Sequence, residues 1–562
     1  MRIITNTLNC FTLLFLYTNA NAQTFNWAGT YGGQANDVVS KIHIDNEGNI
    51  YSTGFYEKDC DFDPTEGSYI LQHDSDTDIF VSKINKNGEL VWAKSIGGIA
   101  NDEGKDITLD TEGNVYITGT FEEMVDFDPG AGTLILTSFN EADVFVLKLD
   151  KDGNFIWAKS FEGDANEQTA GIGLDFAGNI YIAGFFYNTV DFDPSASIFS
   201  ITPKNNVAGF LVKLSTNGDF TWAKQYGSPG IVTAMKVLSN GNIYISGLFD
   251  ENADFNPDEN EDFLLTVPKN HYGMYLLQLD NNGNFIKANT IATTDFQCFT
   301  MGLDFDSQGA VIMTGYFSGQ IQFEVPNNTV TSSILKMYYN SFVVKVNSNG
   351  QNEWAKILSS SLGYNTAMAV GINAKDEALI YGFYAGNFTS DQVTLSEAAL
   401  NNSAENYLLK ISNDGITKTG LKFGGTQMVH SCAIKIDENG HIYLSSGFQN
   451  TIDVNPLPEQ HLQKTAIDMV DSYLLKLNDN ILSVPDLSKR STWSFYPNPT
   501  NDKIMIVSKT SLKEKEYHVF DISGKSVMSG VLDTLQSIDV SQLAAGMYHI
   551  KIENTICKLL KN

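Results

Sequence analysis

A repeat of 65 residues runs through most of this chain and constrains its fold more than any other feature. A Trp-Ala phrase recurs at this interval, and its tryptophans are Trp27, Trp92, Trp157, Trp222 and, after one altered copy, Trp354. Two further copies carry Lys287 and Thr419 at the position of the tryptophan. Self-similarity at a fixed period is typical of stacked repeat folds, in which each repeat buries its faces against its neighbours.

Each copy carries the pattern of four short strands. In the first complete copy, residues 38–44 alternate between apolar and polar side chains and end at the turn Asp45-Asn-Glu-Gly48. Residues 49–56 follow as the hairpin partner, residues 79–84 form the third strand and residues 90–96 the fourth. A single four-stranded sheet leaves its faces uncovered, and radial stacking of such sheets covers them. The pattern therefore predicts a β-propeller.

Counting the strands predicts the number of blades. Strands of the first type start near residues 38, 103, 168, 232, 301, 367 and 431, and strands of the fourth type near residues 25, 90, 155, 220, 285, 352 and 417. The chain thus begins with a fourth strand and ends with a third, which predicts that residues 25–31 pair with residues 472–477. We expect an all-β fold in which residues 23–479 form a seven-bladed β-propeller of four-stranded blades, closed by strand exchange.

Three phrases of the repeat resemble those of a known family. They are Trp-Ala-Lys, Gly-Asn-Ile/Val-Tyr, and Asp-Phe-Asp-Pro, which first stands at residues 61–64. With these phrases, residues 25–478 resemble the bacterial β-propeller repeats called SBBP. The fifth and sixth copies have drifted, because residues 322–326 and 386–390 replace Asp-Phe-Asp-Pro. The resemblance implies a scaffold and no particular reaction.

A different pattern begins after a polar stretch at residues 480–492, which we interpret as a linker. Residues 493–562 contain short strands separated by glycine and Asn-Pro turns, including Tyr496-Pro-Asn-Pro499, and predict a small C-terminal β-sandwich. The ordered phrases resemble the type A C-terminal sorting domain of type IX secretion. The resemblance implies that the domain engages the type IX secretion machinery, that the protein is attached to the cell surface or released, and that its source belongs to the Bacteroidota. An ordinary accessory β-domain is the alternative.

Residues 1–22 have the pattern of a secretory signal peptide. Arg2 supplies the positive charge, residues 11–17 an apolar stretch, and Ala20-Asn-Ala22 the small residues before a cleavage site. No later segment approaches about 18 consecutive apolar residues, so we expect no transmembrane segment. These features predict an extracellular or cell-surface protein.

Charge narrows the classes of ligand. The formal net charge is −30, whereas nucleic acid binding requires clustered lysine and arginine, so we expect no nucleic acid partner. The arginines of the chain are Arg2 and Arg490, both outside the repeats. The repeats therefore cannot hold phosphate or carboxylate groups with a guanidinium.

The Asp-Phe-Asp-Pro phrases are the place where acidic residues recur in register. Side chains two residues apart on an extended chain point the same way, so each pair could offer oxygen ligands to Ca²⁺, the one cofactor that the sequence suggests. The candidate metal ligands are Asp61, Asp63, Asp126, Asp128, Asp191 and Asp193, and the fourth and seventh copies carry Asp254/Asn256 and Asp453/Asn455. We favour the competing interpretation, a loop capped by side-chain hydrogen bonds, because Ca²⁺ requires six or more oxygens.

No set of residues predicts a catalytic site. The chain contains neither G-x-S-x-G nor H-E-x-x-H, and its eight histidines do not recur through the repeats. We therefore predict a surface propeller, more a binding or scaffold protein than an enzyme, that recognises a glycan or a protein through loops on one face. Two alternatives stay open: a secreted polysaccharide-acting enzyme with its site in blades five and six, and a structural envelope protein stabilised by cations.

Overall fold

The computed structural model describes residues 25–562 apart from residues 74–75, 259, 397–403, 426–431, 458–460, 479–492, 497, 509–511, 514, 522–524, 534–535 and 553–554. The described residues form strands and no helix. They divide into two compact units, Met1–Leu482 and Ser483–Asn562. The expected signal peptide at residues 1–22 and the expected linker at residues 480–492 lie outside the described residues.

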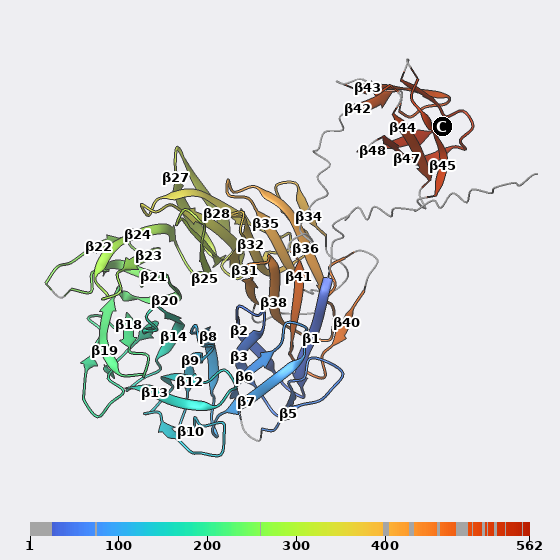
Figure 1. The fold of residues 1–562 in the computed structure, drawn as a ribbon. Coiled ribbons are helices and arrows are strands. Elements are labelled where there is room, and N and C mark those ends of the chain that lie inside the picture. The colour runs from blue at the N-terminus through green and yellow to red at the C-terminus, as the bar shows by residue number, and fades with distance from the viewer. Residues whose placement is uncertain are drawn as a thin grey trace, which may run out of the picture. The chain divides into compact units, whose positions relative to one another are not determined.

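In the described part of the first unit, seven antiparallel sheets share a four-stranded plan (Figure 1). We number these sheets in chain order and name the strands of each sheet from the first to the fourth. They are β2 (Asp37–Ile44), β3 (Ile50–Tyr56), β6 (Asp78–Ile84) and β7 (Leu90–Ile96); β8 (Glu103–Leu109), β9 (Val115–Phe121), β12 (Asp143–Leu149) and β13 (Phe155–Gly163); β14 (Gln168–Leu174), β15 (Ile180–Phe186), β18 (Ala208–Leu214) and β19 (Phe220–Tyr226); β20 (Ser228–Val237), β21 (Ile243–Asp254), β23 (Tyr272–Leu279) and β24 (Phe285–Thr294); β25 (Cys298–Phe305), β26 (Val311–Phe317), β29 (Asn340–Val346) and β30 (Asn352–Leu358); β31 (Tyr364–Ile372), β32 (Ala378–Ala385), β35 (Ala404–Ile411) and β36 (Thr417–Gly425); and β37 (Cys432–Ile436), β38 (His441–Phe448), β41 (Asp471–Asn478) and β1 (Phe25–Gly33).

Neighbouring sheets bury their faces against each other. The second and third strands are the most deeply buried, and in β9 every residue from Val115 to Phe121 is buried. One apolar cluster joins Val81 of the first sheet to Ile117 and Phe145 of the second. These strands are apolar on both faces because each face packs against another sheet.

The seventh sheet joins the two ends of the first unit. Figure 1 shows the blue β1 beside the orange β41, and the two strands pair antiparallel from Phe25 opposite Leu477 to Tyr31 opposite Ser472. The Ser472 hydroxyl also donates a hydrogen bond to the carbonyl oxygen of Asp37, at 2.8 Å. The first strands contact one another in chain order, and β37 contacts β2. The seventh sheet is therefore packed against the first.

The segments between second and third strands form short hairpins, four of which extend the preceding sheet. Their strands are β4 (Cys60–Asp61) and β5 (Ile70–Leu71), β10 (Met124–Asp126) and β11 (Ile135–Thr137), β16 (Val190–Asp191) and β17 (Ser200–Ile201), β22 (Leu264–Thr266) with the end of β21, β27 (Gly319–Val325) and β28 (Asn328–Ile334), β33 (Phe388–Ser390) and β34 (Val393–Leu395), and β39 (Thr451–Asp453) and β40 (Gln463–Thr465). β4 pairs with β1, β16 with β13, β27 with β24, and β39 with β36. These hairpins therefore connect a sheet to the one before it.

The repeated tryptophans lie at the junctions between sheets. Each indole N–H that has a partner donates to a turn carbonyl of the next sheet: Trp27 to Lys86 at 3.1 Å, and Trp92 to Lys151 at 3.2 Å. The Trp92 ring covers Gly153, whose φ is +78° and whose added Cβ would lie 3.0 Å from the ring. Glycine is required there both by the backbone conformation and by the close approach. In the fourth sheet Lys287 replaces tryptophan and donates to the carbonyl of Ser348, the same acceptor position.

The second unit consists of two small sheets around one apolar core. One contains β42 (Trp493–Tyr496), β43 (Lys503–Ser508) and β46 (Ser537–Asp539), and the other contains β45 (Ser526–Val531), β44 (Glu516–Asp521), β47 (Gly546–Ile552) and β48 (Thr555–Lys561). The core joins Ile504 and Ile538 of the first of these sheets to Val519, Ile550 and Leu559 of the second. Alternating buried and exposed residues in β43 agree with a strand that has one face in a core.

Candidate functional site

The predicted metal-ligand pairs lie in three separate hairpins. Asp61 Oδ1 accepts hydrogen bonds from the backbone N–H groups of Asp63, at 3.0 Å, and Tyr69, at 2.8 Å. Asp63 Oδ1 accepts from the N–H and the hydroxyl of Thr65. These contacts hold the loop between β4 and β5 in its turn.

The other two copies repeat this arrangement. The first carboxylate of each pair accepts the backbone N–H groups two and eight residues later, and these pairs are Asp126/Asp128 and Asp191/Asp193. Each pair thus stays within its own hairpin. Among the described residues, no three His, Cys, Asp or Glu side chains form a metal-binding group. The calcium site stays a prediction.

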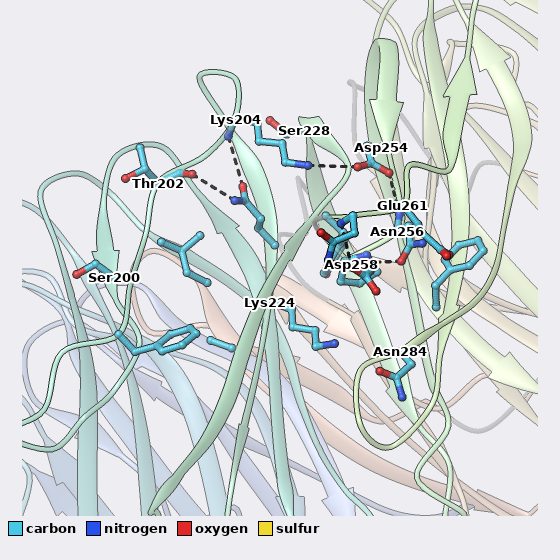
Figure 2. A pocket seen from close by; sticks show the side chains of 18 residues that line it. Ser200, Thr202, Lys204, Lys224, Ser228, Asp254, Asn256, Asp258, Glu261 and Asn284 are labelled. Carbon is cyan, nitrogen blue, oxygen red and sulfur yellow. Dashed lines mark hydrogen bonds and ion pairs between the residues drawn. The ribbon is translucent and has the colours of Figure 1, made fainter.

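An open groove in the first unit lies between the outer edges of the third and fourth sheets (Figure 2). Its volume is about 890 Å³. β17, the loop after it and β19 form one side, and the loop that joins β21 to β22 forms the other. Figure 2 shows Thr202 and Lys204 on the first side and Asp254, Asn256 and Asp258 on the second.

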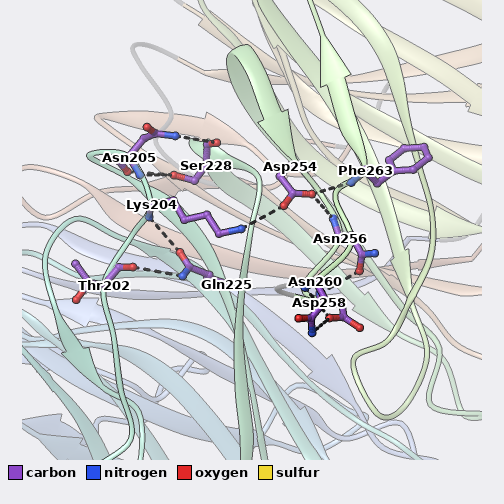
Figure 3. Close-up of polar contacts among 10 residues, drawn as sticks. All are labelled: Thr202, Lys204, Asn205, Gln225, Ser228, Asp254, Asn256, Asp258, Asn260 and Phe263. Atoms are coloured by element: carbon purple, nitrogen blue, oxygen red, sulfur yellow. Dashed lines mark hydrogen bonds and ion pairs between the residues drawn. The ribbon is translucent and has the colours of Figure 1, made fainter.

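One ion pair crosses this groove. Lys204 Nζ lies 3.3 Å from Asp254 Oδ2, although the two residues belong to different copies (Figure 3). Gln225 orients the lysine loop, because its side-chain oxygen accepts from the Lys204 N–H at 3.4 Å and its amide N–H donates to the carbonyl of Thr202 at 3.3 Å. The hydroxyl of Ser228 donates to the carbonyl of Asn205, at 3.1 Å. The first side of the groove is thus held by side-chain hydrogen bonds.

The second side is a series of turns built by acidic and amide side chains. Asp254 Oδ1 accepts the N–H groups of Asn256, at 3.0 Å, and Phe263, at 2.9 Å. Asn256 Oδ1 accepts the N–H of Asp258, and Asp258 accepts the N–H of Asn260. The pKa of Asp258 is lowered by these hydrogen bonds from Asn260. The turn leaves carboxylate and amide groups facing the groove.

Aromatic rings contribute to the lining of the groove. Phe199 packs on Phe220, with ring centroids 5.0 Å apart, and Phe285 packs on Phe263, at 4.6 Å. Phe199 and Phe285 line the groove. The lining also includes Lys224, which is half-buried, and the exposed Glu261, for which no ion pair occurs among the described residues. The groove therefore offers hydrogen-bond donors and acceptors together with apolar rings.

The carboxyl groups with raised pKa lie away from this groove, between sheets. Burial and the neighbouring Asp471 raise the pKa of Asp37 to about 8, and burial and the neighbouring Asp143 raise the pKa of Glu167 to about 9. Their side chains are nearly inaccessible, at 2% and 1% exposure. A general acid must reach its substrate, so these groups are placed for packing and not for catalysis.

The alternative hypothesis of a polysaccharide-acting enzyme places its site in the drifted fifth and sixth copies. Residues 322–326 lie in and just after β27, which pairs with β28 and extends the fourth sheet. A cavity of about 450 Å³ in the fifth sheet contains Lys345, which lies 2.8 Å from Asp306 and 3.3 Å from Glu353. The enzyme hypothesis for these blades stays untested.

From the sequence alone, residues on one side of the groove were identified and those on the other side were not. Asp254 and Asn256 stand out as the altered fourth copy of the Asp-Phe-Asp-Pro phrase. Lys204 and Phe199 belong to the preceding copy and carry no signal in the sequence. Their register with the fourth sheet depends on the packing of one sheet on another.

Two family matches agree with the resemblances found in the sequence. Residues 494–561 match the secretion system C-terminal sorting domain, and residues 91–120 match the SBBP beta-propeller repeat. Within the described part of the chain, no helix has the length and apolar character needed to cross a membrane.

A curated relative matches half of the chain. An uncharacterised WD repeat-containing protein of Acanthamoeba polyphaga mimivirus is 22% identical over 334 residues, which are 50% of this chain and 24% of that protein. The chain thus spans about a quarter of that relative's length.

Solved structures resemble the chain only distantly. A streptogramin B lyase structure has a TM-score of 0.37 and 11% identity, covering 80% of this chain and 97% of its own. A member of the DUF4221 family from Bacteroides vulgatus has a TM-score of 0.31 and 9% identity, covering 80% of this chain and 95% of its own.

The family matches confirm both sequence resemblances, and the sorting domain indicates export to the cell surface or the extracellular space. The chain therefore carries an SBBP beta-propeller repeat at residues 91–120 and a secretion system C-terminal sorting domain at residues 494–561.

Proposed function

We propose that residues 23–479 form a closed seven-bladed propeller that binds a glycan in the groove between the third and fourth sheets. The observation that supports this site is the groove itself, with its amide and carboxylate groups together with Phe199 and Phe285. Sugar hydroxyls both donate and accept hydrogen bonds, and they match such a mixed surface, while the apolar faces of sugar rings pack on aromatic edges.

The proposal extends to the route of export. Residues 1–22 act as the signal peptide, residues 480–492 as a linker, and residues 493–562 as the domain that engages the type IX secretion machinery. The pairing of β1 with β41 supports closure of the propeller, because it leaves neither chain end as an exposed sheet edge. The glycan-binding propeller is then displayed outside the cell or released.

Binding is favoured over hydrolysis by the state of the carboxylates in the groove. Asp254 and Asp258 accept backbone hydrogen bonds within their own turns. The usual pair for glycoside hydrolysis combines an ionised carboxylate with a protonated one, whose pKa is raised. The acids with raised pKa lie buried between sheets instead.

The experiment measures binding of the full chain to a panel of soluble polysaccharides by affinity electrophoresis. The test variant combines Lys224→Ala with Glu261→Ala. Both side chains line the groove, and neither makes a side-chain hydrogen bond or an ion pair among the described residues. The control is Lys159→Ala, because Lys159 occupies the same strand position one copy earlier, outside the groove. We expect the double variant to weaken binding about tenfold, equivalent to about 1.4 kcal/mol for two lost hydrogen bonds.

The control separates this groove from a general surface effect. Binding by Lys159→Ala should equal that of the unaltered protein. Equal losses in both variants, or no polysaccharide bound at all, would overturn the proposed glycan site.

A further inference from the structure

The seven first strands surround a central channel. A cavity of about 330 Å³ is lined by residues of β2, β8, β14, β20, β25, β31 and β37. Residues two apart on a strand face the same way, so the strands present two rings of side chains to this channel. The rings are defined by the register of each first strand with its second strand.

Charged side chains in these rings come from five of the seven strands. The first ring contains Lys41 and Asp106, with glycine or alanine in the other five strands. The second ring contains His43, Lys236, Asp304 and Lys435, with threonine or glycine in the other three. The small residues leave room for the lysine side chains to extend into the channel.

The two carboxylates of the channel already have partners. Asp304 lies 3.1 Å from Lys236 Nζ and accepts the N–H of Ile372 at 3.0 Å. Asp106 accepts the N–H of Ile172 at 3.0 Å. Among the described residues, neither Lys41 nor Lys435 has a hydrogen-bond or ion-pair partner.

The lysines repel one another electrostatically. Burial, Lys236 and Lys41 lower the pKa of Lys435 to about 8, although Asp106 and Asp304 act in the opposite direction. Burial and the charges of Lys435 and Lys236 lower the pKa of His43 to about 3, so this histidine is neutral. β14 and β31 bring no titratable side chain to the channel. An anion between the lysines would relieve this repulsion.

We propose that the channel binds a small oxyanion, such as sulfate or phosphate, between Lys41 and Lys435. A lysine ammonium binds such groups as a point charge and needs no guanidinium fork. A second cavity, of about 480 Å³, shares His43 and Lys435 with the channel. Its lining adds Lys86 and Lys476, and also the acidic side chains of Asp45, Glu47, Asp437 and Glu438. It provides an approach to the lysines from the junction of the seventh and first sheets.

This site is separate from the proposed glycan groove, which lies at the outer edges of the third and fourth sheets. Its failure and the failure of the glycan proposal are therefore distinguishable. The oxyanion is recognised in either of two forms, as a free ion or as the sulfate ester of a sugar that reaches into the channel.

Calorimetry and thermal melting of the full chain test the proposal, with sodium sulfate compared to sodium chloride at equal ionic strength. We expect heat of binding and a melting temperature that rises with sulfate concentration. A second arm uses glucose 6-sulfate, and binding of the ester as well as of the free ion identifies an esterified ligand. Sulfate does not titrate near neutrality, so its affinity should fall several-fold between pH 7 and pH 9 as Lys435 loses its proton.

The variants Lys41→Met and Lys435→Met remove the unpartnered charges, and Lys159→Met is the control outside the channel. Without sulfate, the first two should melt no lower than the unaltered protein, because each loses a repelled charge. They should also lose the shift caused by sulfate, whereas Lys159→Met should keep it. A sulfate shift that survives the combined Lys41→Met and Lys435→Met variant, or no difference between sulfate and chloride, would overturn the proposal.

Discussion

The junctions that the first three sheets make with their neighbours bury carboxyl groups, whereas the junction between the fifth and sixth sheets buries amides. Where the second and third sheets meet, Asp143 lies beside Glu167, and where the seventh and first meet, Asp471 lies beside Asp37. The equivalent positions between the fifth and sixth sheets carry Asn340 and Asn365.

The amide junction achieves similar packing with ordinary hydrogen bonds. The Asn365 side-chain oxygen accepts from the hydroxyls of Ser341, at 2.5 Å, and Tyr407, at 3.2 Å. An amide is neutral at every pH, whereas a buried carboxyl group must keep a proton to stay neutral. The difference teaches that the same geometric position can make a junction sensitive or insensitive to pH.

The largest expected effect is a fall in stability between pH 6.5 and pH 8. Burial raises the pKa of Asp37 and of Asp102 to about 8, whereas the unfolded chain ionises these groups near 3.8. The folded state therefore binds more protons than the unfolded state in this window, so stability falls as pH rises. His43 does not change the stability above about pH 6.5, because its imidazole is then neutral in both the folded and the unfolded state. Lys435 counteracts the fall in stability only above about pH 8, where the folded state begins to lose its proton. We expect the melting temperature to drop by about 5 °C. A flat or rising melting temperature across this window would contradict the assignment.

Exchanging a carboxyl group for an amide at one junction, and an amide for a carboxyl group at the other, should exchange the pH dependence of their stability. Asp37→Asn should raise the melting temperature at pH 8 and reduce its dependence on pH, with an effect on the order of 1–2 kcal/mol. Asn365→Asp should do the reverse, because it places an ionisable group at a position that is 0% exposed. The comparison fails if both variants shift in the same direction at pH 8.

Tryptophan and lysine at the same junction position should contribute different amounts to the free energy of unfolding. Trp92→Ala should cost about 2 kcal/mol, because it removes a partly buried ring packed on the next sheet. Lys287→Ala should cost about 1 kcal/mol, since it removes mainly one hydrogen bond to a carbonyl. Urea unfolding curves of the two variants measure the difference. A larger loss from Lys287→Ala would show that the lysine junction is the more strongly packed.

The smallest effect separates two turn glycines. Gly153→Ala combines a left-handed φ with a clash against Trp92, whereas Gly309 has φ +77° and nothing within 4 Å of its added Cβ. Both should destabilise by about 1 kcal/mol through backbone conformation, and Gly153→Ala should lose more through the displaced ring. Equal losses in thermal melts would indicate that the ring moves aside freely.

Much of the strand arrangement followed from local patterns. The position of Trp92, the hairpin turn at Gly153 and the alternation in each strand recur at one spacing, so pairing within a sheet needs few long-range decisions. The all-β character was predicted in this way, whereas the C-terminal sorting domain was predicted from its resemblance to a known family. The groove between the third and fourth sheets was not predicted, because its ion pair joins Lys204 to Asp254 across two sheets.

The sequence by itself determined the repeat and the strands of each sheet, because short-range spacing encodes both, and it carried the sorting domain as a resemblance to a known family. Only the tertiary structure decided which side chains of different copies meet. Lys236 and Asp304 are separated by 68 residues, and they form an ion pair only because their first strands lie beside each other around the channel. Packing of one sheet on the next sets that register, and residue spacing within a copy carries no information about it.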